Sequence, residues 1–161
     1  MKTNIKFCEG DLFKSKCQTI TNTVNCHGVM GKGIALEFKK RYPRYFNDYK
    51  FLCKNGIVKL GYPYVYTEST VNDPISILSF PTKGHWTHNS NIQDIINGLN
   101  QFCKTYKYYG ISSIAFPPLG CGCGGLNWST VVPIMNEFLS KIDIPVEIYL
   151  PLNAIPKQLE F

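Results

Sequence analysis

Lys83 is the residue of this sequence whose surroundings most favour chemistry. It follows the apolar run 75–80 and lies in the sequence Phe80-Pro81-Thr82-Lys83-Gly84-His85-Trp86. A charged lysine can stabilise or protonate a leaving group, whereas a neutral amine can attack an electrophilic carbon. The sequence leaves both roles open. It also allows Lys83 to be an exposed lysine in a turn or a residue that only binds phosphate. His85 and Trp86 either position the lysine or stack on a base, or else they pack as a corner of the fold.

Two glycine-rich stretches predict a site for an anion such as a phosphate. One lies at 28–33 after the β-branched run 19–25, and the other lies at 120–125 after the apolar run 111–116. Glycines let backbone N–H groups approach and converge on a ligand, and both stretches lead into predicted helices. If the two preceding strands are neighbours, both loops line one crevice at the carboxyl edge of the sheet. The alternative is that these glycines only make tight turns.

Polar residues near these loops are further candidates for ligand contacts. The Asn25 amide can both donate to and accept from ribose hydroxyls. Asp11 follows the first predicted strand, where it either reads a ligand or serves as a turn or N-cap residue. His27 is expected to border the ligand, and Cys121 and Cys123 are expected to be small loop residues and not nucleophiles. With three histidines at scattered positions, no metal site is predicted.

The hydrophobic pattern alternates between periods typical of strands and of helices. Strands are predicted at 5–9, 19–25, 58–60, 64–68, 75–80, 111–116 and 146–150. Helices are predicted at 34–42, 43–54, 92–106 (with a capping box from Ser90 to Gln93) and 131–142. The run Lys39-Lys40-Arg41 is expected on the solvated face of the first helix. This alternation predicts one domain over residues 1–161, a three-layer α/β sandwich.

Composition restricts the class of protein and its surroundings. The excess of 17 basic over 11 acidic residues favours a polyanionic partner such as nucleic acid or a nucleotide, or serves only solubility. The seven cysteines are an odd number and show neither a CxxC nor a CxxC…HxxxH pattern, which argues against a disulfide framework and a structural zinc site. A reducing cytosol fits this cysteine content best. The N-terminus lacks a signal-peptide core and no apolar run approaches about 18 residues. A cytoplasmic protein is therefore expected.

Three motifs in order resemble those of a macrodomain, at 23–39, 80–86 and 117–128, and the likeness extends from Ile5 to about Pro151. Within that family they are most similar to the macrodomains of DarG antitoxins. The resemblance implies a mixed β-sheet between helices and removal of ADP-ribose from thymine bases in DNA, with no cofactor and no metal. It also implies the partners ADP-ribose, ADP-ribosylated DNA and a DarT-type toxin, no membrane, and a monomer.

The resemblance also assigns roles residue by residue. It places Asp11 at the adenine amino group, Asn25 at the distal ribose and Lys83, as the catalytic residue, at the anomeric carbon. The implied ADP-ribose ligands are Asp11, Leu12, Asn25, Val29, Met30, Gly31, Lys32, Gly33, Pro118, Leu119, Gly120, Cys121, Gly122, Cys123, Gly124 and Gly125. The implied substrate-positioning residues are His27, His85 and Trp86.

Gly124 bears on which substrate is cleaved. It stands where the related terminal ADP-ribose glycohydrolases carry an acid, which favours DNA over protein as the substrate. Two alternatives stay open, which are a binding module without turnover and a hydrolase of protein-linked ADP-ribose or of an ADP-ribose phosphate ester.

Overall fold

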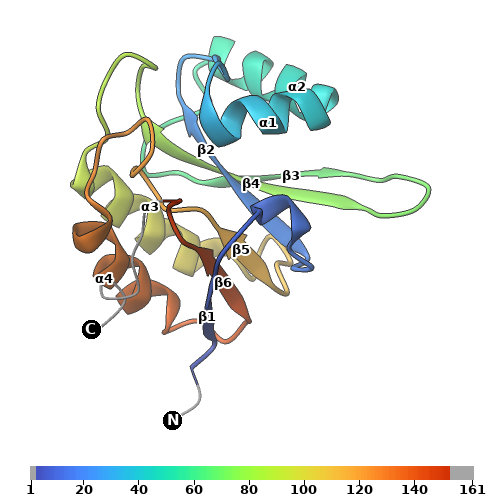
Figure 1. Ribbon diagram of the computed structural model, residues 1–161. Helices are drawn as coiled ribbons and strands as arrows, with labels where there is room; N and C mark the ends of the chain where they lie inside the picture. Colours follow the sequence, from blue (N-terminus) through green and yellow to red (C-terminus); the bar gives the residue numbers. More distant parts are fainter. Residues whose placement is uncertain (1–2, 153–161) are drawn as a thin grey trace.

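A mixed β-sheet forms the middle layer of the molecule (Figure 1). The computed structural model describes residues 3–152, and the predicted domain of 1–161 extends beyond this range at both ends. The strands are β1 (Ile5–Cys8), β2 (Thr19–Asn25), β3 (Tyr64–Glu68), β4 (Ile75–Lys83), β5 (Ile114–Phe116) and β6 (Val146–Tyr149). Their order is β1-β6-β5-β2-β4-β3, and all neighbours are parallel except β3, which is antiparallel to β4.

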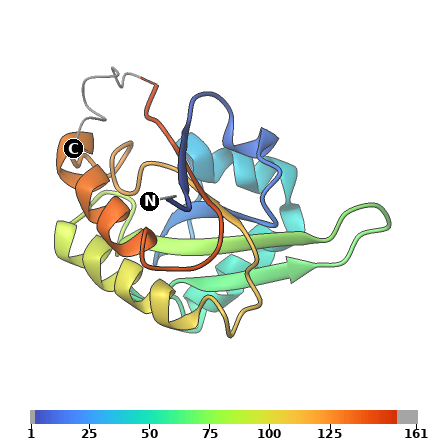
Figure 2. The same ribbon diagram turned by 90° about the horizontal axis from the view of Figure 1, so that it is seen from below.

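Helices cover both faces of this sheet (Figures 1 and 2). They are α1 (Gly33–Arg41), α2 (Pro43–Lys54), α3 (Ile92–Thr105) and α4 (Trp128–Leu139), with a short 3₁₀ helix at Leu12–Lys14. The first two helices pack on one face and the last two on the other. The predicted three-layer arrangement with a mixed sheet is therefore confirmed.

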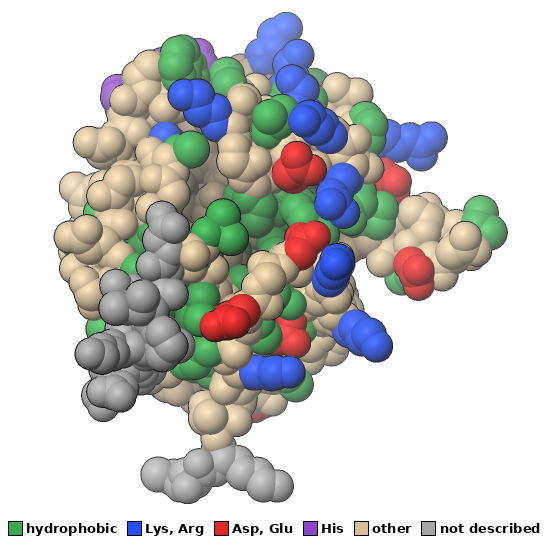
Figure 3. Space-filling model, in the orientation of Figure 1, with side chains coloured by type: hydrophobic (Ala, Val, Ile, Leu, Met, Phe, Trp, Pro, Cys, Tyr) green, Lys and Arg blue, Asp and Glu red, His purple; other side chains and the backbone are tan. Residues whose placement is uncertain are grey.

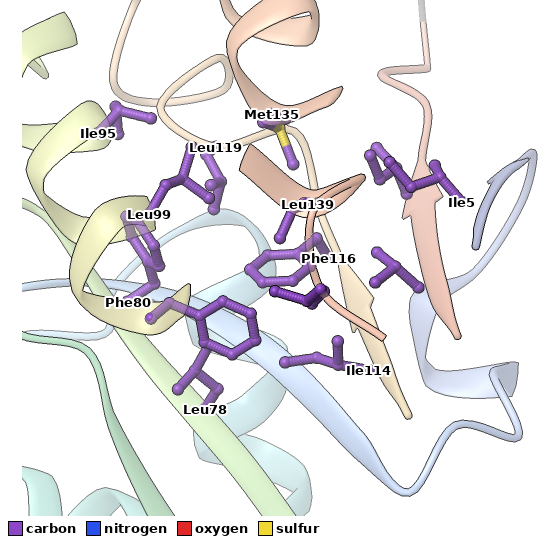
Figure 4. Packing of buried hydrophobic residues seen from close by; sticks show 14 of the residues in the cluster. Ile5, Leu78, Phe80, Ile95, Leu99, Ile114, Phe116, Leu119, Met135 and Leu139 are labelled. Atoms are coloured by element: carbon purple, nitrogen blue, oxygen red, sulfur yellow. The ribbon is translucent and has the colours of Figure 1, made fainter. Parts of the chain in front are cut away.

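Alternation along the strands builds two separate cores. In β4, Leu78 and Phe80 join the core beneath α3 and α4, whereas Ile77 points into the core beneath α1 and α2. Figure 4 shows Phe80 packed beside Leu99 of α3 and near Phe116 of β5. Each such fully buried side chain contributes about 2 kcal/mol from apolar burial. The two cores hold the carboxyl edge of the sheet rigid from both faces.

The structure differs from the predicted elements at several points. Val58–Leu60 is not a strand: of these residues only Val58 is buried, and none of them pairs with the edge strand β3. The predicted strand 75–80 continues to Lys83, since Pro81 stays extended beside a register shift in the ladder with β2. Lys83 is therefore the last residue of a strand. The N-cap of α3 is Asn91, whose side chain accepts a hydrogen bond from the Gln93 N–H, and not Ser90.

Candidate functional site

A cleft of about 1080 Å³ crosses the carboxyl ends of the parallel strands. Asp11, after β1, lines one end, and Lys83, at the end of β4, lines the other. Neighbouring strands are about 4.8 Å apart, so these ends are separated by about 19 Å. The strands that precede the glycine loops, β2 and β5, are neighbours, as the single-crevice prediction required. The cleft is therefore long enough for an extended, dinucleotide-sized ligand.

Most of the predicted site residues line this cleft. The exceptions are Met30, Leu119, Gly125, His27 and His85. Met30 and Leu119 are 1% and 0% exposed, so their side chains belong to the core and only their backbone can serve a ligand.

The first glycine loop, residues 26–32, is held by the side chain of Asn25. Its Oδ1 accepts from the backbone N–H groups of His27 (3.0 Å), Gly28 (3.2 Å) and Val29 (3.4 Å). Its Nδ2 donates to the Val29 carbonyl at 2.7 Å, and the Tyr49 hydroxyl donates to the Asn25 carbonyl and Oδ1 at 2.7 and 2.8 Å. Burial raises the pKa of Tyr49 far above its usual value, so it remains a donor. Because Oδ1 is occupied, Asn25 retains mainly an amide N–H for a ligand.

The N-terminus of α1 opens into the cleft directly after this loop. Its N-cap, Lys32, makes no side-chain capping bond, and the first turn contains no acidic residue. Gly33, Ile34 and Ala35 line the cleft there. Free N–H groups and the positive end of the helix dipole favour an anion at such a position.

The second glycine loop, residues 117–127, is held by backbone hydrogen bonds. The Leu126 N–H donates to Gly120 O at 2.9 Å, and the Ser90 N–H donates to Gly124 O at 2.8 Å. Packing at Gly124 is so tight that a Cβ would lie 2.3 Å from Ser90 Oγ and 2.5 Å from Gly120 O. Burial raises the pKa of the Cys121 thiol to about 11, so this thiol is protonated at neutral pH and is a poor nucleophile.

Lys83 lies where the two glycine loops meet. It is the register partner of Asn25, and its carbonyl accepts from the Cys26 N–H at 3.1 Å. Its Nζ donates to the carbonyl oxygens of Trp86 (3.1 Å) and Cys123 (3.3 Å). The amine is thereby fixed by neutral main-chain groups at the end of the cleft opposite Asp11, where it can act on a bound ligand.

The predicted substrate-positioning residues form a ring cluster beside Lys83. The ring of His85 lies 5.3 Å from Trp86 in a stacked arrangement (28°) and 4.4 Å from His27, measured between centroids. Partial burial is the main cause that lowers the pKa of His85, and the nearby His27 and His88 lower it further. His85 is therefore neutral at pH 7, and of these rings Trp86 lines the cleft.

The Asp11 end of the cleft includes residues that the sequence analysis missed. The Asp11 carboxylate caps the short helix by accepting from the Phe13 N–H at 2.9 Å, and it also lines the cleft. The guanidinium of Arg41 lies 4.1 Å from the centroid of the Phe13 ring, and both residues line the cleft with Tyr149. Arg41 is exposed, as predicted for the run 39–41. Its contact with Phe13 was not predicted, because it depends on how α1 packs and leaves no local signal in the sequence.

Two kinds of feature are absent from residues 3–152. No group of three or more His, Cys, Asp or Glu residues there is arranged to hold a metal ion. No helix in that range combines the length and apolar character that a membrane crossing needs.

A sequence model of the Macro domain family matches residues 21–135, a range that contains the first glycine loop, Lys83 and the second glycine loop. The chain belongs to the macrodomain family. The matched range ends within α4, so it leaves out β1 with Asp11 and β6.

Solved structures support the same assignment of the fold. This macrodomain superposes on the macrodomain of Thermus aquaticus DarG with a TM-score of 0.86 at 37% identity, covering 91% of this chain and 98% of that chain. The match to Thermosipho africanus DarTG in complex with ADP-ribose has a TM-score of 0.91 at 42% identity, covering 97% of this chain and 44% of that chain.

Among characterised proteins, the macrodomain is 42% identical over 165 residues to a Thermosipho africanus DNA ADP-ribosyl transferase-DNA ADP-ribosyl glycohydrolase fusion protein. The alignment covers 93% of this chain but 42% of that protein. The chain thus spans less than half the length of four curated relatives that it matches.

Proposed function

We propose that this macrodomain is a metal-independent ADP-ribosyl glycohydrolase that removes ADP-ribose from thymidine bases in DNA. The observation that carries the proposal is the Lys83 amine, held by Trp86 O and Cys123 O at the end of the cleft between the two glycine loops. Relatives at 37 to 42% identity are named for DNA ADP-ribosyl glycohydrolase activity. Their shared role implies that the chain reverses the action of a DarT-type toxin.

The cleft suggests one direction for bound ADP-ribose. The adenine lies at the Asp11 end, against Phe13 and Arg41, where a carboxylate can accept from an exocyclic amine. The diphosphate lies at the N-terminus of α1 and the glycine loops, which offer free N–H groups and no acid in the first turn. The distal ribose then lies beside Asn25 and Lys83, which are register partners.

Lys83 can assist the reaction in either of two ways. As an ammonium it stabilises or protonates the departing thymine while water adds to the anomeric carbon and the carbon–nitrogen bond breaks. As a neutral amine it adds to that carbon, the thymine leaves with a proton, and the resulting Schiff base is hydrolysed by water to release ADP-ribose and the free lysine. Both routes consume one water, and both require the amine where the main-chain carbonyls hold it.

We also propose the setting in which the enzyme acts. All seven cysteines are free, which fits a reducing cytoplasm. We propose that the macrodomain is monomeric. A DarT-type toxin is its proposed protein partner, since one relative joins the transferase and the glycohydrolase in one chain.

The test compares the intact chain with Lys83→Ala and Lys83→Arg. Each is incubated with a thymidine-ADP-ribosylated oligonucleotide and, in parallel, with ADP-ribosylated protein, while ADP-ribose affinity is measured by calorimetry. We expect Lys83→Ala to bind ADP-ribose but to release it from DNA about 100- to 10,000-fold more slowly. Lys59→Ala, an exposed lysine outside the cleft, is the matched control.

The outcomes separate the candidate functions and the two roles of Lys83. Full turnover by Lys83→Ala would overturn the catalytic assignment, cleavage of protein alone would overturn the DNA assignment, and binding without cleavage would identify a binding module. Partial activity of Lys83→Arg supports the ammonium role, because a guanidinium keeps its charge but forms no Schiff base. A covalent adduct at Lys83 after borohydride reduction supports the amine route.

A further inference from the structure

A second hollow lies on the other side of the first glycine loop, between this loop and α2. It measures about 620 Å³ and is lined by Cys26, His27, Gly28, Asn47, Lys50, Phe51, Cys53 and Lys54. The loop therefore separates two spaces. Its later residues, from Val29, face the ADP-ribose cleft, and His27 and Gly28 face the second hollow.

Aromatic rings connect the mouth of the cleft to this hollow. Trp86 lines the cleft and is 52% exposed, and its ring stacks on His85 at 5.3 Å. The ring of His85 lies 4.4 Å from His27, which shares the second hollow with Phe51. Phe51 is 63% exposed on the surface of α2. Every nucleobase can stack on an aromatic face, so the exposed rings of Trp86 and Phe51 on either side of the histidines suit bases of a single strand.

Positive charge lies along the same path. Lys50 and Lys54 are exposed one turn apart on α2, and within the described residues neither takes part in an ion pair. No aspartate or glutamate lines the hollow. On α1, by contrast, Lys40 and Arg41 lie 3.9 and 3.8 Å from Glu37 carboxylate oxygens. Figure 3 shows histidines at the upper left of the molecule, with basic side chains close to them as well as along the top and the right edge.

We propose that the DNA strand flanking the modified thymine binds along a flanking surface formed by Trp86, His85, His27, Phe51, Lys50 and Lys54. Bases beside the target stack on the rings, and the backbone phosphates meet the two lysines of α2. The occupant is single-stranded, because a base inside a duplex stack does not reach the Lys83 amine. This inference rests on the proposed function and adds a site for the polymer outside the ADP-ribose cleft.

The experiment measures how much the polymer adds to catalysis. The intact chain is assayed on an ADP-ribosylated single-stranded oligonucleotide and on the ADP-ribosylated thymidine nucleoside, and the ratio of the two kcat/KM values is taken. We expect Lys50→Ala/Lys54→Ala to lower this ratio about tenfold, with the loss in KM, and Phe51→Ala to lower it by a similar factor. The control is Lys104→Ala/Lys141→Ala, which removes the same charge at exposed positions on the α3 and α4 side.

Salt dependence gives an independent measurement. For the oligonucleotide, the negative slope of log kcat/KM against log salt concentration should become shallower by about 1.4 in Lys50→Ala/Lys54→Ala, since each phosphate contact contributes about −0.7 on a single strand. An unchanged ratio and slope, or an equal effect of the two double variants, would overturn the flanking surface. A surface built for a protein partner would give that result.

A failure of the proposed function is distinguishable from a failure of this inference. If the intact chain cleaves neither substrate, the proposed function fails. The flanking surface is then judged by fluorescence anisotropy with an unmodified labelled single strand. Weaker binding by Lys50→Ala/Lys54→Ala than by Lys104→Ala/Lys141→Ala supports it, and equal binding overturns it.

Discussion

The two glycine loops face the same cleft but are held in different ways. The first is fixed by a side chain, because the Asn25 amide bonds to three backbone N–H groups and one carbonyl of the loop. The second is fixed by main-chain bonds and by tight packing, with Gly124 against Ser90 and Gly120. The first loop therefore depends on one residue being present, and the second depends on one Cβ being absent.

Of the substitutions that test this difference between the loops, replacing Asn25 should lower the free energy of unfolding the most. Asn25→Ala removes the acceptor for three N–H groups in a residue that is 7% exposed, so we expect the free energy of unfolding to fall by about 3 kcal/mol. Urea denaturation measures the change. The control is Asn55→Ala, whose exposed amide bonds only to Phe51 O in the same helix turn, with an expected loss of about 0.5 kcal/mol. Equal losses in the two variants would mean that Asn25 does not hold the loop.

Adding one methyl group to the second loop should have the next largest effect. Gly124→Ala forces the chain away from Ser90 Oγ and Gly120 O, so we expect a loss of about 1–3 kcal/mol and weaker binding of ADP-ribose. Gly122→Ala in the same loop is the matched control for stability, because no atom of the described residues lies within 4 Å of its Cβ position. Thermal unfolding and calorimetry measure both effects. If the two variants behave alike, close packing is not what shapes this loop.

Removing the Tyr49 hydroxyl should have the smallest effect. Tyr49→Phe takes away the donor to Asn25 O and Oδ1 but leaves the three loop N–H groups bonded, so we expect a loss of about 1 kcal/mol. Tyr62→Phe, at a 59% exposed tyrosine, serves as the control. A double-mutant cycle with Asn25→Ala sharpens the comparison, because additive losses would show that the hydroxyl acts apart from the loop.

Residue types and order predicted most of the segments that line the cleft. The glycine loops follow β2 and β5, Asn25 and Lys83 are the last residues of β2 and β4, and the parallel order of β5, β2 and β4 brings them to one edge. Asp11 was predicted as either a cap or a ligand-reading residue, and the structure places it as a cap that also lines the cleft.

Features that depend on packing between distant segments were not predictable. Arg41 lies over Phe13 because of how α1 packs on the short 3₁₀ helix, and the run that contains it has the pattern of a solvated face. Val58 looked like part of a strand because strand propensity does not reveal whether a neighbouring strand is available. Asn25 offered a ligand-binding amide, but its sequence context did not reveal that its oxygen is already occupied.

The two bonds of the Lys83 amine end on main-chain oxygens of Trp86 and Cys123, and every amino acid possesses such an oxygen. Substitutions at positions 86 and 123 that preserve the path of the backbone therefore keep the Lys83 amine in place. The side chains at these two positions can change the surroundings of the amine without removing the acceptors that position it.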